Sequence, residues 1–219
     1  MATREVLAEL AAQYQQANAQ AVSASSAGGV DVSRRVQSGE SVDVVVLASN
    51  AIDQLIADGK LRAGSRVDLV RSGIAIAVRA GAPRPDIGSE RAVRDLVLSA
   101  RTIGYSTGPS GLYLEKLFER WGIFAEIRSR TVQPPPGVPV GILVARGEIE
   151  FGFQQLSELL NLPGITVLGS LPDAIQSITT FSAAVGTSSA QPDAARAFIA
   201  FLAAPAATAA KRQHGMDSA

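Results

Sequence analysis

The feature that most constrains the fold is a strand, turn and helix motif at residues 102–121 (TIGYSTGPSGLYLEKLFERW). A short strand is predicted at 102–106, followed by a small polar turn at 107–111 and then a helix. Four large apolar residues recur at the i, i+3, i+4 and i+7 positions of one helix face, namely Leu114, Leu117, Phe118 and Trp121. Such a face must be buried, and strands that lead directly into amphipathic helices are typical of α/β domains.

The turn at 107–111 also has a chemistry of its own. The first N–H groups of a helix have no partners inside the helix, and the helix dipole adds partial positive charge there. Gly108 and Gly111 allow a ligand to approach the backbone, and Thr107 and Ser110 add hydroxyl groups. This arrangement favours an oxyanion such as a carboxylate, phosphate or metal oxoanion. No Gly-Lys-Ser/Thr follows, so it is not a nucleotide P-loop. The alternative is an ordinary turn capped by Ser110.

A similar junction is predicted earlier in the chain. Residues 20–25 (QAVSAS) read as a strand that leads through the small residues 25–29, including Ser25 and Ser26, into a helix. The uninterrupted apolar run at 43–48 (DVVVLA) is typical of a strand buried on both faces of a parallel sheet. Ser49 then begins another helix. Strands alternating with helices predict a doubly wound α/β fold, in which ligands bind at the carboxyl ends of strands.

The rest of the chain extends this pattern into two lobes. A β-prone segment at 66–79 runs into a stiff Gly- and Pro-rich linker at 81–85, so we place a crossing between lobes there. Lobe 1 is predicted to comprise residues 1–80 and 180–219, and lobe 2 residues 81–179. Further strands are expected at 126–132, 151–154 and 179–185, a helix at 192–203 and a frayed tail after it. The proline run at 134–136 is expected to be a rigid loop.

Composition removes several classes of function. The 20 Lys and Arg residues balance the 20 Asp and Glu residues, so no basic face supports nucleic-acid binding. The absence of cysteine excludes disulfides, thiol catalysis and cysteine-ligated zinc. No apolar run approaches the roughly 18 residues of a membrane-spanning helix.

Catalytic motifs are also missing from the sequence. There is no HExxH, GxSxG or GxGxxG motif, and the single histidine, His214, is expected to be solvated. We therefore expect no catalytic residue, metal or cofactor. Hydroxyls, amides and helix starts without a reactive group favour an anion-binding protein over an enzyme.

Five segments in order resemble the type II periplasmic solute-binding proteins, and most of all the molybdate-binding component of ABC transporters and its relatives. These segments are GESVDVVVLAS, AVRAGAPRPDI, GPSG, GEIEFGFQQLSEL and TTFSAAV followed by PDAARAFIAFL. The resemblance covers nearly the whole chain. It implies two α/β lobes, each a mixed sheet flanked by helices, joined by two crossing strands that act as a hinge around a bound anion.

The resemblance also implies the ligand-binding residues. Serine hydroxyls and backbone amides of both lobes hold the oxyanion in this family, without a cationic side chain. By position these are Ser25, Ser26 and Ser49 in lobe 1, and Ser110, Gly111, Phe153 and Gln154 in lobe 2. Tyr105 and Gln154 suit a larger carboxylate. A molybdate- or tungstate-like oxyanion or a carboxylate is the expected ligand, an ABC permease the expected partner, the periplasm the expected location and a monomer the expected state.

Two departures from the family keep alternatives open. The family's late tyrosine is replaced by Phe181, which removes a hydroxyl. Family members also begin with a strand before the first helix, whereas this sequence begins at the helix, so we expect a missing first strand and an upstream start with a signal peptide. The first hypothesis is an oxyanion-binding protein for ABC uptake. The alternatives are a binding protein or isomerase for a small polycarboxylate such as aconitate, and a cytoplasmic anion sensor.

Overall fold

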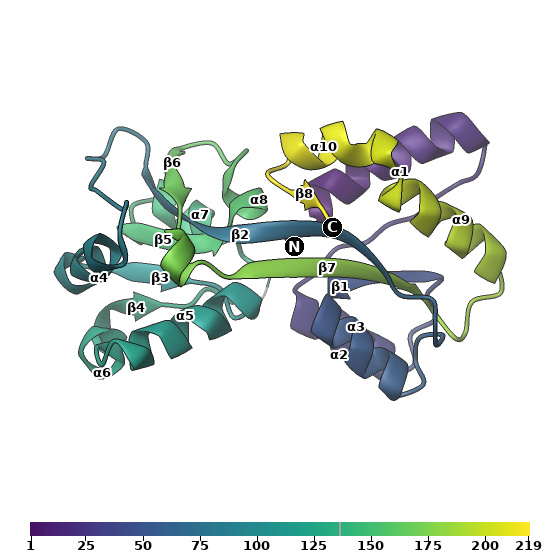
Figure 1. Cartoon of the computed structure of the whole chain (residues 1–219), viewed down its shortest axis with the longest axis horizontal. Coiled ribbons are helices and arrows are strands. Elements are labelled where there is room, and N and C mark those ends of the chain that lie inside the picture. The colour runs from purple at the N-terminus through teal and green to yellow at the C-terminus, as the bar shows by residue number, and fades with distance from the viewer. Residues whose placement is uncertain (136) are drawn as a thin grey trace. The chain divides into compact units, whose positions relative to one another are not determined.

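The computed structural model describes residues 1–135 and 137–219, and it divides the chain into two compact units (Figure 1). Unit 1 is Met1–Arg71 with Thr179–Ala219, and unit 2 is Ser72–Ile178. Pro136, the last residue of the predicted proline loop, lies outside the described residues.

The first boundary falls inside strand β2 (Val67–Arg79), not at the predicted position after residue 80. β2 is continuous, and its two ends have different partners. Its early residues Val70 and Arg71 pair with β8 (Asp217–Ser218), whereas the residues from Ile74 onward pair with strands of unit 2. The strand itself therefore crosses between the units, and the Gly- and Pro-rich linker follows the crossing.

Unit 1 places helices on both faces of strand β1 (Val44–Ala48), which pairs antiparallel with β7 (Ile178–Val185). One face of β1 packs Val45 and Leu47 against α2 and α3, and the other packs Ala48 against the remaining helices. This explains why the run is apolar at every position, although the predicted parallel pairing is wrong. The helices of unit 1 are α1 (Arg4–Asn18), α2 (Gly29–Gln37), α3 (Ser49–Ala57), α9 (Pro192–Ala203), η3 (Pro205–Ala207) and α10 (Thr208–Gln213).

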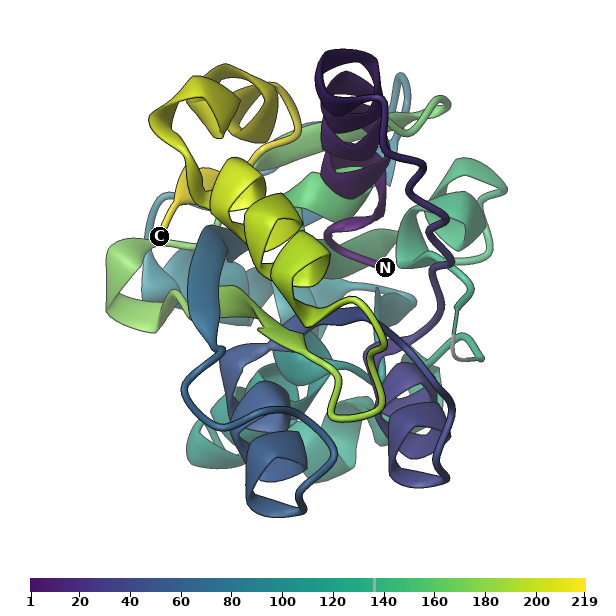
Figure 2. The same ribbon diagram turned by 90° about the vertical axis from the view of Figure 1, so that its right-hand side faces the viewer.

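Residues 20–25 do not form the predicted strand. The chain leaves α1 through Ala19, which has a left-handed φ of 50°, and then runs without regular structure to Gly28 (Figure 2). A strand is defined by hydrogen bonds to a neighbouring strand, and no described strand pairs with this segment. Ser25 and Ser26 are consequently exposed.

Unit 2 is a mixed sheet flanked by helices. β3 (Ile103–Tyr105) is parallel to β4 (Thr131–Val132) and β5 (Phe151–Gln155), while the end of β2 is antiparallel to β5 and to β6 (Ile165–Ser170). The helices of unit 2 are α4 (Glu90–Ser99), α5 (Pro109–Arg120), α6 (Phe124–Ile127), η1 (Arg128–Arg130), α7 (Val140–Ala145), α8 (Leu156–Leu159) and η2 (Asp173–Ile175).

The strand predicted at 126–132 is mostly helical, because α6 and η1 occupy all but its last two residues. The alternation of polar and apolar residues there imitates a strand. Only Ile127 is buried among the first five positions, and the Thr131 hydroxyl donates to the Ile127 carbonyl oxygen at 3.0 Å, a spacing of four residues that belongs to helical geometry.

The end of the chain is ordered through two contacts that the sequence did not predict. Instead of fraying, the chain passes from α10 into β8, which pairs with β2. His214 is not solvated, since its side chain is only 14% exposed and its Nε2 lies 2.8 Å from Oε2 of Glu9. This contact joins α10 to α1 within unit 1.

No single helix in the described part of the chain combines the length and apolar character of a membrane span. The pair Pro192–Ala203 and Pro205–Gln213 meets both conditions only when taken together, and it is bent by 56°.

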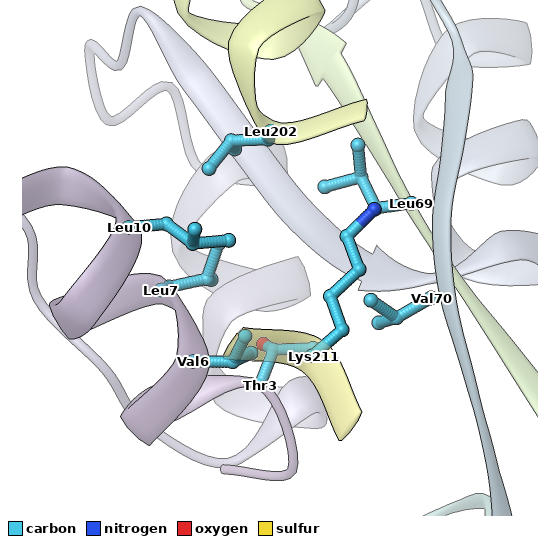
Figure 3. A pocket seen from close by; sticks show the side chains of 8 residues that line it. All are labelled: Thr3, Val6, Leu7, Leu10, Leu69, Val70, Leu202 and Lys211. Atoms are coloured by element: carbon cyan, nitrogen blue, oxygen red, sulfur yellow. The ribbon is translucent and has the colours of Figure 1, made fainter. Parts of the chain in front are cut away.

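A buried lysine lies in the core of unit 1. Lys211 on α10 is 1% exposed, and Figure 3 shows its side chain extending among apolar residues of α1, β2 and α9. These residues are Val6, Leu7, Leu10, Leu69, Val70 and Leu202. Burial lowers the pKa of the Lys211 amino group. No ion pair found among the described residues includes it, so its charge is uncompensated.

Replacing this lysine by an apolar side chain of similar length is expected to stabilise the fold. Lys211→Met should raise the free energy of unfolding at pH 7 by about 1–2 kcal/mol, because no cation has to be desolvated. In the natural chain the unfolded state binds more protons, so stability should rise with pH up to the ordinary lysine pKa of 10.5. The variant should lose this rise.

Urea unfolding at several pH values measures both effects. Lys116→Met is the matched control, because Lys116 is exposed on α5. A Lys211→Met variant that unfolds more easily than the natural chain at every pH would contradict the expectation.

Candidate functional site

The turn between β3 and α5 forms a compact cluster of uncharged donors in unit 2. The Ser106 and Ser110 hydroxyl oxygens lie 3.2 Å apart, and the Gly108 N–H donates to the Ser106 hydroxyl at 3.3 Å. α5 begins at Pro109 and has 12 residues, so its dipole places partial positive charge at this turn. Ser110 and Gly111 were predicted, whereas Ser106 was missed because it was counted as the last residue of the strand.

Gly111 makes this turn possible. A Cβ atom at this position would lie 1.6 Å from the carbonyl oxygen of Ser106, a separation that no side chain tolerates. The first turn of α5 therefore approaches the end of β3 more closely than any other residue would allow. The structure thus gives Gly111 a role in packing the helix on the strand, and its role in ligand approach stays a prediction.

Tyr105 and Phe153, both predicted ligand contacts, lie in the core of unit 2. Tyr105 is 1% exposed and Phe153 is fully buried, and both rings pack against Phe118, at 5.9 and 6.4 Å between centroids. Burial, followed by the charge of Glu115 and a hydrogen bond to it, raises the pKa of Tyr105 to about 12. The Tyr105 hydroxyl is therefore already engaged by a carboxylate.

Gln154, the third predicted contact in this unit beyond the turn, is also buried and hydrogen-bonded within the unit. Its Oε1 accepts a hydrogen bond from the Val140 N–H at 3.0 Å, at the start of α7. Its side chain also hydrogen-bonds the Glu158 carboxyl on α8. Burial is the largest cause and raises the pKa of the Glu158 carboxyl, whereas the charge of the amino terminus and then this hydrogen bond lower it.

The turn and Glu158 belong to the same edge of the sheet. β3 and β5 are parallel, and Tyr105 at the end of β3 is in register with Phe153 of β5. The chain continues from the first strand into the Ser106–Ser110 turn, and from the second, which ends with Gln154 and Gln155, into α8. Ligands of α/β sheets bind at this carboxyl edge. Glu158, which is partly exposed, was missed because burial of a carboxylate is not readable from the sequence.

The three serines predicted in unit 1 have different surroundings. Ser49 begins α3, and its hydroxyl contacts the Thr180 carbonyl oxygen at 3.0 Å and the Ser182 hydroxyl at 2.7 Å. The Ser182 hydroxyl in turn donates to Asp68 at 2.6 Å and, as the largest cause, lowers the pKa of Asp68. Ser49 is thus tied to β7, while Ser25 and Ser26 are exposed in the irregular segment before α2.

Among the described residues, no group of three His, Cys, Asp or Glu side chains is placed to hold a metal ion.

Comparison with known proteins identifies the family. Residues 1–217 match the model of the bacterial extracellular solute-binding proteins. The chain belongs to this family. A curated relative, an aconitate isomerase from Pseudomonas sp., is 41% identical over 186 residues, which cover 84% of this chain and 71% of the relative.

Solved structures of solute-binding proteins share the fold. The periplasmic molybdate-binding protein of Azotobacter vinelandii superimposes with a TM-score of 0.80 at 20% identity, covering 98% of this chain and 94% of its own. The tungstate-binding protein of Desulfovibrio alaskensis G20 gives a TM-score of 0.69 at 16% identity, covering 97% and 92%. The resemblance to type II periplasmic solute-binding proteins and the mixed α/β fold expected from the sequence are confirmed.

The close approach of Gly111 to the Ser106 carbonyl can be tested for its contribution to the stability of the turn between β3 and α5. Gly111→Ala should lower the free energy of unfolding by about 1–3 kcal/mol or more, because the new methyl group collides with the Ser106 carbonyl. Gly108→Ala is the control, since Cβ there meets only the Ser106 hydroxyl oxygen, at 3.5 Å.

The control should cost less than about 1 kcal/mol, the size of a helix-cap effect. Equal losses of stability for the two variants in urea unfolding would show that the contact at Gly111 does not control the turn.

Proposed function

We propose that this solute-binding protein binds a small polycarboxylate through uncharged hydrogen-bond donors and interconverts the cis and trans isomers of aconitate. The observation that carries the proposal is the 41% identity to an aconitate isomerase over most of both chains. It favours a carboxylate over a tetrahedral oxyanion, because the molybdate- and tungstate-binding neighbours share the fold at 20% identity or less.

The donor cluster of unit 2 supports a carboxylate ligand. We propose that Ser106, Ser110 and the N–H groups at the start of α5 contact a carboxylate, because hydroxyls and helix N–H groups suit negative oxygen atoms. In unit 1 we propose Ser25, Ser26 and Ser49 as contacts. We propose that Tyr105 and Phe153 instead support the carboxyl edge of the sheet from the core.

A second candidate is capture of a molybdate-like oxyanion in the periplasm for delivery to an ABC permease. The turn between β3 and α5 supports it too, because this turn presents uncharged donors and no cation, which serve an inorganic oxyanion as well as a carboxylate. The two candidates differ in the ligand that stabilises the protein and in turnover.

Thermal unfolding with cis-aconitate, trans-aconitate, citrate, molybdate, tungstate and sulfate tests both candidates. A ligand at 100 times its Kd should stabilise the folded chain by about 2.7 kcal/mol and raise its Tm accordingly. We expect this from the aconitate isomers, together with conversion of one isomer into the other. Stabilisation by molybdate or tungstate alone would favour the second candidate, and stabilisation by none of these anions would contradict both.

The serine contacts are tested by single substitutions. Ser110→Ala should weaken aconitate binding by about tenfold or more, the usual loss when a hydrogen bond to a charged group is removed. Ser99→Ala is the matched control in unit 2, because the Ser99 hydroxyl donates to the Leu96 carbonyl oxygen within α4 and precedes β3. Isothermal titration calorimetry gives both values, and an unchanged Kd for Ser110→Ala would remove this serine from the site.

A further inference from the structure

The orientation of the Gln154 amide is fixed by its surroundings. Gln154 is 2% exposed, and its Oε1 accepts the backbone N–H of Val140 at 3.0 Å. The amide cannot turn over without placing its NH₂ group against that N–H. Its NH₂ group is therefore left to donate to the Glu158 carboxyl. A buried amide held in one orientation thus positions one carboxyl group.

Glu158 differs from Glu40 and Asp68, two other carboxyl groups whose surroundings change their pKa. Contacts with Arg35 and Ser182 are the largest causes that lower the pKa values of Glu40 and Asp68, respectively. For Glu158, burial is the largest cause and raises the pKa, against the opposing effects of the amino-terminal charge and of the Gln154 hydrogen bond. A carboxyl group that is partly withdrawn from water and held by one oriented amide is suited both to accept and to return a proton.

The position of Glu158 also matters. It follows β5 at the sheet edge where the Ser106–Ser110 turn follows β3, as the parallel register of Tyr105 with Phe153 requires. A partly buried carboxylate at this edge opposes the binding of an anion by like-charge repulsion. Pure anion capture gains nothing from such a group, whereas a reaction that moves a proton requires one.

We propose that Glu158 is the proton-transfer residue of this protein, that Gln154 is its positioning residue, and that the substrate is an unsaturated polycarboxylate with a methylene group next to its double bond. This proposal rests on the proposed function.

The chemistry is a 1,3-proton shift that balances without a co-reactant. The Glu158 carboxylate removes a proton from the methylene carbon, and the C–H electron pair spreads over the three-carbon unit and the attached carboxylates. The donors of the Ser106–Ser110 turn stabilise the charge that develops on a carboxylate. Glu158 then returns the proton to the former vinyl carbon. The double bond has moved by one position, and the conformation of the bound substrate about the former single bond determines whether the product is cis or trans.

The decisive variant is Glu158→Gln in the full chain. It keeps the size of the side chain and a hydrogen bond to Gln154 but cannot exchange a proton. Turnover of cis-aconitate, followed by ¹H NMR, should fall by about 100-fold or more, the usual contribution of a general acid–base residue. Exchange of the methylene protons with D₂O should fall equally, while the rise of Tm with aconitate should persist. Glu158→Asp should recover part of the turnover.

The control is Glu148→Gln, at the opposite end of β5, where Glu148 is exposed and 3.9 Å from Arg146. This variant should convert cis-aconitate at the rate of the natural chain.

The positioning role of Gln154 is read from the pH profile of kcat/KM. Loss of its hydrogen bond raises the Glu158 pKa, so Gln154→Met should move the acid limb of the profile to higher pH.

Two results would overturn the inference, and they are distinguishable. If aconitate does not stabilise the natural chain, the proposed function fails and the inference fails with it. If aconitate stabilises the chain but Glu158→Gln turns over within about threefold of Glu148→Gln, or no isomer is formed at all, then Glu158 has no role in proton transfer and the ligand-binding proposal stands alone.

Discussion

The structure of unit 2 depends on how closely α5 approaches the end of β3. The space between the Gly111 Cα atom and the Ser106 carbonyl holds no methyl group, so the helix starts directly against the strand. This contact aligns the Ser106 and Ser110 hydroxyls and the Gly108 N–H at one place. The carboxyl edge of a parallel strand pair and the positive end of a helix dipole therefore coincide, and an anion-binding edge results from backbone packing without any cationic side chain.

Local sequence patterns correctly predicted the helices and strands whose own residues carry a clear signal. The helix at Pro192–Ala203 has its predicted bounds, and the apolar run at β1 is a strand. The helix has apolar residues at helical spacing and the strand is an apolar run, and each has capping or turn residues beside it. The strands predicted at 20–25 and 126–132 were wrong for a different reason. Their composition suits a strand, but a strand also requires a neighbour, and pairing is decided by distant segments.

The same limit applies to the candidate site. The turn that holds Ser110 and Gly111 was predictable because the small, polar turn and the following helix are contiguous. Gln154 was predicted as a ligand contact from its position in the family resemblance and from its amide, but the Val140 N–H and the Glu158 carboxyl engage that amide. His214 meets Glu9, far away in the sequence, for which no local signal exists. Tertiary partners thus decide whether a polar side chain is available, and the sequence alone does not name them.

The continuity of β2 has a mechanical consequence. One uninterrupted strand carries ladder bonds to β8 at its start and to β5 and β6 towards its end, so a single backbone segment is built into both sheets. If either sheet unfolds, one end of β2 loses its hydrogen-bonded neighbours. The other sheet then contains a strand that is held at one end alone. Heat denaturation should consequently proceed as a single calorimetric peak, although the chain divides into two compact bodies.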